Sequence, residues 1–207
     1  MNVARLLPLS LLAVLCVSPR VAALADVMTE RDVAEALSIA NGSEATRAVF
    51  HAGYLVGIDD PLVERLEVIT EFRRFVLAAE EQLKAGNWMM ARGGFDPKGR
   101  TLKDILKPFS SQVSLRAWLR FHPQNNYGAL PPFDMLLGEP TLLAIGATRE
   151  PHVTIASGEP GTRDVINGAT IEVFYNAAAI NNRSLPIRLV FENKEAGGVS
   201  VDFSRLR

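Results

Sequence analysis

Cysteine is almost absent from this chain of 207 residues, because the only one is Cys16, within the apolar N-terminal run. Residues 26–207 contain no thiol. This excludes disulfide bonds, a cysteine nucleophile, and zinc or iron–sulfur sites built on thiolates from that part of the chain. A hydrophobic core must therefore stabilise the fold, in agreement with a hydrophobic content of 48%.

A strong charge of one sign is also missing. The chain has 22 basic and 23 acidic side chains, which is a net charge of −1. Removal of residues 1–25 would take away Arg5 and Arg20 and leave a net charge of about −3. Because nucleic-acid binding depends on a basic surface, this balance predicts no nucleic-acid partner. No later apolar stretch reaches the roughly 20 residues of a spanning helix, so we expect no membrane span in residues 26–207.

Motifs of reactive chemistry are lacking as well. Each of the three histidines, His51, His122 and His152, stands without a second histidine at metal-binding spacing. There is no Gly-x-Ser-x-Gly elbow and no phosphate-binding loop. The sequence therefore predicts no cofactor and no metal, and it identifies no catalytic residue. One alternative stays open, a hydrolase or metal-dependent enzyme whose site is assembled in space from these histidines and nearby carboxylates.

The N-terminus has the features of a secretory signal peptide. A short basic region precedes the apolar run Leu6–Val17, which has 12 residues and ends at Ser18-Pro19-Arg20. Ala23-x-Ala25 then matches the small-x-small cleavage pattern. Since the run is too short to span a bilayer, we expect cleavage near Ala25 and a periplasmic or extracellular protein, although a retained anchor is the alternative. An exported chain without cysteine favours a bacterial source.

Residues 26–110 are predicted to be mainly helical. Thr29 and Asp32 form the pattern of a capping box, and Asn41-Gly42 marks the end of the helix that follows. Ser43 is expected to cap a second helix that runs to about His51. Residues 54–58 fit a buried strand or a helix end equally well, residues 86–100 are expected to be irregular, and a short helix is predicted at residues 102–108.

The most regular helical pattern runs from Pro61 to Ala85. Asp60 suits the N-cap position and Pro61 the first helical position. Apolar residues recur at steps of three and four, at Leu62, Leu66, Ile69, Phe72, Val76, Ala79 and Leu83. This spacing predicts one long amphipathic helix of about 37 Å, which would lie across a sheet.

Residues 111–207 are predicted to form an antiparallel sheet or a small β-sandwich. Apolar residues alternate with polar ones from Gln112 to Phe121, which is typical of a half-buried strand. Further strands are expected at residues 133–137, 141–147, 170–175, 185–191 and 199–203, with turns at residues 181–182 and 197–198. Helices followed by strands indicate an α+β fold, and we expect both regions to pack as one domain.

Two features of the predicted strands suggest binding. Three side chains project from one face of the strand at residues 112–121, and guanidinium groups there could stack on the indole. The alternative is that the long helix covers this face. The polar loop that follows carries amides and an aromatic ring, which suit sugars or peptide backbone, although these residue types also form turns. The candidate binding residues are Arg116, Trp118, Arg120, His122, Asn125, Asn126 and Tyr127.

Three short runs resemble segments of exported bacterial proteins without an assigned function. They are residues 67–77, 119–125 and 201–206. The resemblance implies an envelope or extracellular setting and brings no catalytic residue with it. The leading hypothesis is therefore a non-enzymatic exported binding or interaction protein with a protein or carbohydrate partner. The alternatives are the enzyme described above and a structural envelope component whose long helix docks on a partner.

Overall fold

The computed structural model describes residues 24, 28–125, 127–154, 165–180 and 183–207. The helices are α1 (Glu30–Ala40), α2 (Glu44–Ala52), α3 (Glu71–Lys84), α4 (Trp88–Ala91), α5 (Leu102–Leu106) and α6 (Ala177–Ile180). The strands are β1 (Leu55–Val56), β2 (Val63–Ile69), β3 (Gln112–Arg120), β4 (Phe133–Leu137), β5 (Gly146–Thr154), β6 (Val165–Asn176), β7 (Ser184–Phe191) and β8 (Lys194–Asp202). Short 3₁₀ turns lie at Lys107–Phe109 and Phe203–Arg205.

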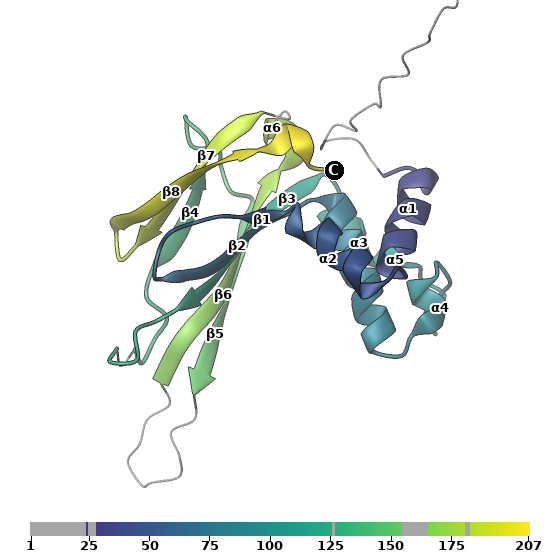
Figure 1. Cartoon of the computed structure of the whole chain (residues 1–207), viewed down its shortest axis with the longest axis horizontal. Coiled ribbons are helices and arrows are strands. Elements are labelled where there is room, and N and C mark those ends of the chain that lie inside the picture. Colours follow the sequence, from purple (N-terminus) through teal and green to yellow (C-terminus); the bar gives the residue numbers. More distant parts are fainter. Residues whose placement is uncertain (1–23, 25–27, 126, 155–164, 181–182) are drawn as a thin grey trace, which may run out of the picture.

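The strands form two antiparallel sheets, one of five strands in the order β1-β2-β3-β6-β5 and one of three strands in the order β4-β7-β8. Figure 1 shows the two sheets facing each other, with α1 to α5 gathered on the far side of the five-stranded sheet. This arrangement confirms the predicted α+β class with a sandwich of two sheets. Helices precede most strands along the chain, as expected, but β1 and β2 belong to the N-terminal region and join the larger sheet.

The main core fills the space between the two sheets. Leu115 and Leu119 of β3 point into it, as their alternation predicted, and meet side chains from β6, β4 and β7 such as Ile171, Leu137 and Ile187. A second apolar cluster lies within the helical layer, where α3 buries Phe72, Phe75, Val76 and Ala79 against α1 and its neighbours. The apolar face of α3 is therefore covered by this chain itself.

The predicted helix from Pro61 to Ala85 is wrong in its first part. Residues 63–69 form strand β2, and α3 begins only at Glu71, where the Thr70 hydroxyl accepts a hydrogen bond from the amide of Arg73. Leu62, Leu66 and Ile69 have helical spacing, but β-branched residues are frequent in this stretch and favour a strand. Pairing with β3 satisfies the backbone of β2, and that pairing overrides the local periodicity.

Other boundaries also differ from the expectation. The predicted strand at residues 141–147 starts later and is β5, from Gly146 to Thr154. Gly197 and Gly198 are paired within β8, and the β7–β8 turn uses Glu192 and Asn193, both at positive φ, as tight hairpin turns require. The turn predicted at residues 181–182 lies outside the described residues. The stretch at residues 54–58 contains β1, and α4 forms within the connection expected to be irregular.

The predicted helix starts are confirmed at Thr29 and Ser43. Thr29 and Asp32 form a reciprocal capping box at α1, and the Ser43 hydroxyl accepts the amide hydrogen of Thr46 at α2. The predicted helix end is confirmed at Asn41, which caps the C-terminus of α1. These short-range signals depend only on neighbouring residues, which explains why the sequence alone locates them.

Gly168 is needed where β6 pairs with the end of β3. A Cβ atom at this position would lie 2.3 Å from the carbonyl oxygen of Leu119 and 3.2 Å from Nδ1 of His152. Because the first contact is with backbone, the two strands would have to separate to admit a side chain. Gly57 differs, since a Cβ atom there would have no heavy atom within 4 Å.

Arg207 joins the end of the sandwich to the helical layer. Its guanidinium donates to Asp32 and Glu35 of α1, with nitrogen–oxygen distances of 2.6 Å in both pairs, and lies 4.5 Å from the ring centroid of Phe72 in α3. Its backbone oxygen accepts hydrogen bonds from the hydroxyls of Thr70 and Tyr54. These contacts connect elements that are distant in sequence.

Candidate functional site

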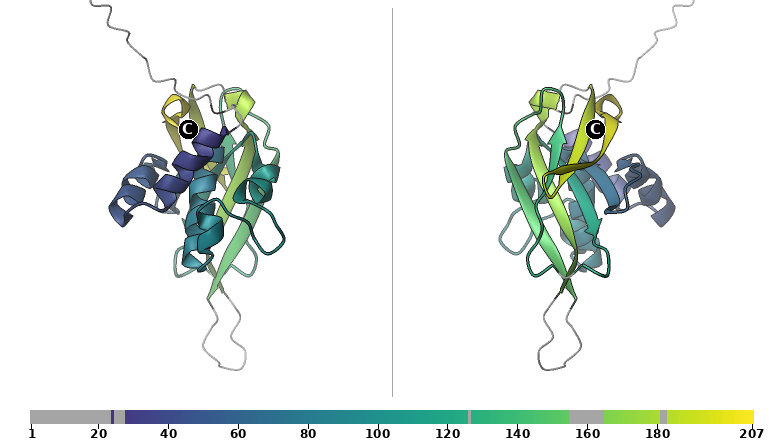
Figure 2. Two further views of the ribbon diagram at one scale, coloured as in Figure 1. Left: turned by 90° about the vertical axis from the view of Figure 1, so that its right-hand side faces the viewer. Right: turned by 90° about the vertical axis from the view of Figure 1, so that its left-hand side faces the viewer.

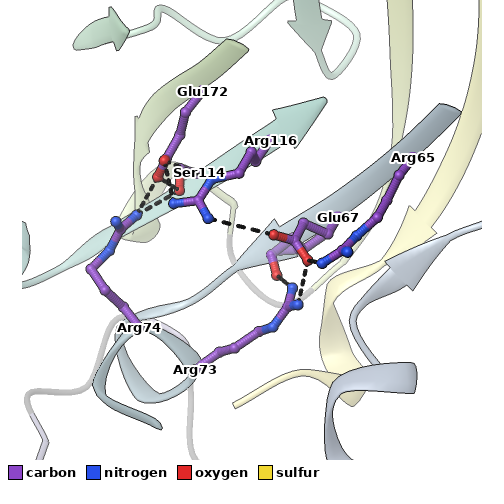
Figure 3. Close-up of polar contacts among 8 residues, drawn as sticks. Arg65, Glu67, Arg73, Arg74, Ser114, Arg116 and Glu172 are labelled. Atoms are coloured by element: carbon purple, nitrogen blue, oxygen red, sulfur yellow. Dashed lines mark hydrogen bonds and ion pairs between the residues drawn. The ribbon is translucent and has the colours of Figure 1, made fainter. Parts of the chain in front are cut away.

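A buried polar layer separates α3 from the outer face of the five-stranded sheet. Ser114 and Arg116 of β3 lie on the face opposite the core, as their alternation predicted, and α3 covers this part of the face, which was the alternative to an exposed platform. Figure 3 shows two clusters of contacts, one around Glu172 of β6 and one around Glu67 of β2, which Arg116 joins through an ion pair with Glu67 at 3.7 Å. The arginines of the layer come from β2, from β3 and from the first turn of α3.

Glu172 is the acceptor at the centre of the first cluster. Its carboxylate accepts hydrogen bonds from Ser114 (2.5 Å), from Arg74 (2.7 Å), and from Nε and Nη2 of Arg116 (3.0 and 2.7 Å). Burial alone would raise the pKa of Glu172, but the Ser114 hydrogen bond and the two guanidinium charges outweigh it, so the pKa is lowered. The fork-shaped contact fixes the orientation of Arg116.

Glu67 and Arg73 form the second cluster, at the junction of β2 and α3. Arg73 donates to the Glu67 carboxylate and to the Val68 carbonyl oxygen, and both side chains are almost completely buried. Burial lowers the pKa of Arg73, and the charge of Glu67 opposes that shift. Arg65 pairs with the same carboxylate at 2.9 Å from a half-exposed position.

Trp118 lies beyond this layer on the same face of β3. The guanidinium carbon of Arg65 is 4.2 Å from its ring centroid and that of Arg116 is 5.8 Å away. The indole is partly exposed. Arginine groups therefore lie near the tryptophan ring, as the strand pattern suggested for Arg116, and Arg65 is a partner that the sequence analysis did not identify. Arg120 follows on the same face, roughly 7 Å further along the strand.

An open groove begins at Arg120 and has a volume of about 590 Å³. It brings together the end of β3, the loop after it, the residues just before β2 and the end of β7. The lining residues are Pro61, Leu62, Arg120, Phe121, His122, Pro123, Asn125 and Phe191. Most of the lining is apolar, with a cation, an imidazole and an amide among these residues, which is the general character of a ligand site.

Hydrogen bonds and ring contacts hold the loop of the groove in place. The amide of Gln124 donates to Nδ1 of His122 (3.2 Å), and that contact leaves the proton of the neutral ring on Nε2. Phe121 contacts Tyr127 edge-on, with 5.1 Å between ring centroids, and lies 6.0 Å from Phe191. These rings form an aromatic base beneath the groove.

The groove therefore gathers three of the predicted binding residues, Arg120, His122 and Asn125. Tyr127 supports the base through Phe121, and Asn126 lies outside the described residues. Sequence reasoning missed Pro61, Leu62 and Phe191, which come from other elements. No local pattern could have found Phe191, because it is about 70 residues away in the chain and reaches the groove only when the two sheets pack.

The three histidines lie in separate surroundings. His51 Nε2 is 3.0 Å from the Glu80 carboxylate, His152 Nε2 is 2.9 Å from the Thr170 hydroxyl, and His122 contacts the backbone of its own loop. In the described part of the chain, no group of three or more His, Cys, Asp or Glu residues is arranged to hold a metal ion. Nor does any helix among the described residues have the length and apolar character needed to cross a membrane.

Comparison with known proteins adds no family to this geometry. No protein-family model matches the chain, and neither does any curated protein or solved structure. Function must therefore be argued from the groove and its neighbouring side chains.

Proposed function

We propose that this chain is an exported, non-enzymatic binding protein that takes up a peptide segment of an envelope protein in the groove at Arg120. The observation that carries the proposal is the convergence of Arg120, His122 and Asn125 on one apolar hollow. Its volume is within the roughly 300–1,000 Å³ of typical ligand pockets.

The lining favours a peptide with an apolar side chain next to a carboxylate. Phe121, Phe191 and Pro123 offer an apolar surface for the side chain. Arg120 is exposed and has no ion-pair partner among the described residues, so its charge is available for a carboxylate. His122 Nε2–H and the Asn125 amide can bond the peptide backbone.

Binding is favoured over catalysis because His122 is not positioned as a base. Its Nδ1 contacts a backbone amide and not a carboxylate, and a base of the usual catalytic arrangement is oriented by such a third group. The three histidines also have separate partners, and the one that lies beside a carboxylate, His51 at 3.0 Å from Glu80, does not line the groove.

Selection of peptides against the purified protein tests the proposal. We expect enriched peptides to place a carboxylate beside an apolar residue and to bind at least about tenfold more weakly to Arg120→Ala, because a charge-assisted contact is lost. Phe191→Ala should weaken binding similarly, whereas Arg31→Ala, which removes an exposed arginine on α1, should not. Peptides that bind all variants equally, or selective binding of glycans in a parallel array, would overturn the peptide assignment.

Export is tested separately. We expect N-terminal sequencing of the secreted form to begin at Asp26, because Ala23-x-Ala25 provides the cleavage site. A protein that begins at Met1 would instead support the retained anchor.

A further inference from the structure

The connection between α3 and α5 exposes three large apolar side chains close together in sequence. Trp88 is 58% exposed, Met89 69% and Phe95 59%. Figure 1 shows α4 at the edge of the molecule furthest from the three-stranded sheet, and Figure 2 shows the helical layer from its own side. We refer to residues 86–100 as the α4 tip.

The α4 tip is held in this conformation by specific contacts. Met90 and Ala91 are its buried residues, and the side chain of Asn41, which caps α1, donates to the Ala91 carbonyl oxygen at 2.8 Å. The Asp96 carboxylate accepts the amides of Lys98 and Arg100, both at 2.8 Å, which closes the following turn. The apolar side chains are thus presented outward by an ordered backbone.

The α4 tip lies in a basic part of the chain. Six basic and two acidic side chains occur from Lys84 to Lys107, a net charge of +4, whereas the whole chain has a net charge of −1. Both acidic side chains already accept hydrogen bonds, Asp96 within the turn described above and Asp104 in the capping box of α5. Among the described residues, Lys84 and Arg92 have no ion-pair partner.

Two of these cations, Lys84 and Arg92, line a shallow hollow beside Trp88, which has a volume of about 680 Å³. Arg47 of α2 also contributes to the lining, and it pairs with Glu80 at 3.6 Å. Arg92 also lies 6.0 Å from the Trp88 ring centroid. A phosphate group held by these cations would lie next to an indole, which is the side chain that prefers the boundary between headgroups and acyl chains.

We propose that the α4 tip docks peripherally on a membrane surface that contains anionic phospholipid. Trp88, Met89 and Phe95 enter the interface, and the surrounding cations contact lipid phosphates. Apolar side chains combined with a basic surround are the features of interfacial binding segments, and each contributes to affinity. Charge complementarity favours a lipid surface over a second copy of this chain, because two net-positive segments repel each other. The proposal involves a different surface from the peptide groove and does not depend on it.

Vesicle binding tests the proposal with Trp88 as the reporter. The chain has only two tryptophans, so the Trp118→Phe protein reports on Trp88 alone. With vesicles of equal phosphatidylglycerol and phosphatidylcholine we expect a blue shift of Trp88 emission and co-sedimentation. Binding to pure phosphatidylcholine should be weaker by about tenfold or more, because attraction to anionic lipid is missing, and 0.5 M salt should weaken binding to the mixed vesicles in the same way.

Matched variants separate the α4 tip from exposed apolar residues elsewhere. Met89→Ser/Phe95→Ser should weaken vesicle binding by about tenfold or more, since it removes two inserting side chains and keeps the reporter. Leu143→Ser/Val153→Ser changes two exposed residues at other positions and should bind as the parent protein does. Circular dichroism melting should show that both variants remain folded.

The proposal is overturned if mixed vesicles do not bind the parent protein, or if both double variants bind equally. It is also overturned if sedimentation shows self-association that Met89→Ser/Phe95→Ser removes while vesicles have no effect, because the partner is then a second copy. Arg120→Ala should leave vesicle binding unchanged, so the outcome is independent of the peptide proposal.

Discussion

Removal of the Glu67 carboxylate should be among the most destabilising single changes in this protein. Arg73 is 0% exposed and Glu67 is 1% exposed, so water cannot replace the carboxylate beside the guanidinium. The guanidinium would keep its hydrogen bond to the Val68 carbonyl oxygen, but its charge would have no counter-ion within that cluster. Loss of one partner of a buried ion pair costs about 3–5 kcal/mol.

Glu67→Gln keeps one acceptor oxygen, so we expect a loss at the lower end of that range, about 3 kcal/mol in the free energy of unfolding. Arg73→Met should cost less, about 2 kcal/mol, because Glu67 retains Arg65 at 2.9 Å. Glu67→Leu/Arg73→Met removes both charges together. The loss of unfolding free energy in this double variant should be smaller than the sum of the losses for Glu67→Leu and Arg73→Met by about 2 kcal/mol or more. The reason is that each single variant leaves one member of the buried pair without the other, whereas the double variant leaves neither.

Urea denaturation followed by far-ultraviolet circular dichroism measures these free energies. Arg149→Met serves as the control, because it breaks an ion pair with Asp134 (3.0 Å) whose side chains are 45% and 59% exposed. Its cost should remain within about 1 kcal/mol. Additive costs across the Glu67–Arg73 cycle, or a Glu67→Gln cost no larger than that of the control, would refute the reasoning.

Three further predictions concern single positions. The pKa of Glu172 is lowered in the folded protein, so its stabilising contribution is present above its unfolded pKa of 4.5 and is lost as pH falls through its folded pKa. The difference in unfolding free energy between wild type and Glu172→Gln, measured by urea titration, should therefore shrink below about pH 4.5. Gly168→Ala should destabilise the protein by about 1–3 kcal/mol, because the added methyl group meets the backbone of β3. Gly57→Ala should be nearly neutral, and thermal melts of both variants measure the difference. Arg207→Ala should cost about 1–2 kcal/mol, because partly exposed ion pairs and a cation–π contact are lost, and hydrogen exchange should show faster opening of α1.

Local patterns located several elements of this fold without reference to the rest of the chain. The alternation from Val113 to Phe121 predicted β3 and the face on which Arg116, Trp118 and Arg120 lie. Capping side chains predicted where α1 and α2 begin. Each of these signals depends on residues within a few positions of one another, and the structure keeps that local preference.

The tertiary structure decided the elements for which local signals conflicted or were missing. Leu62, Leu66 and Ile69 fit a helix, but their backbone pairs with β3, and Arg73 binds Glu67 where the strand turns into α3. The groove likewise needs Phe191, which arrives from the opposite sheet. Sequence periodicity states which side chains can share a face, whereas burial and pairing with distant segments choose between two conformations of similar local free energy. For that reason the composition, the caps and the two faces of β3 could be read directly from the sequence, while the strand–helix junction at Thr70 and the walls of the groove exist only in the folded chain.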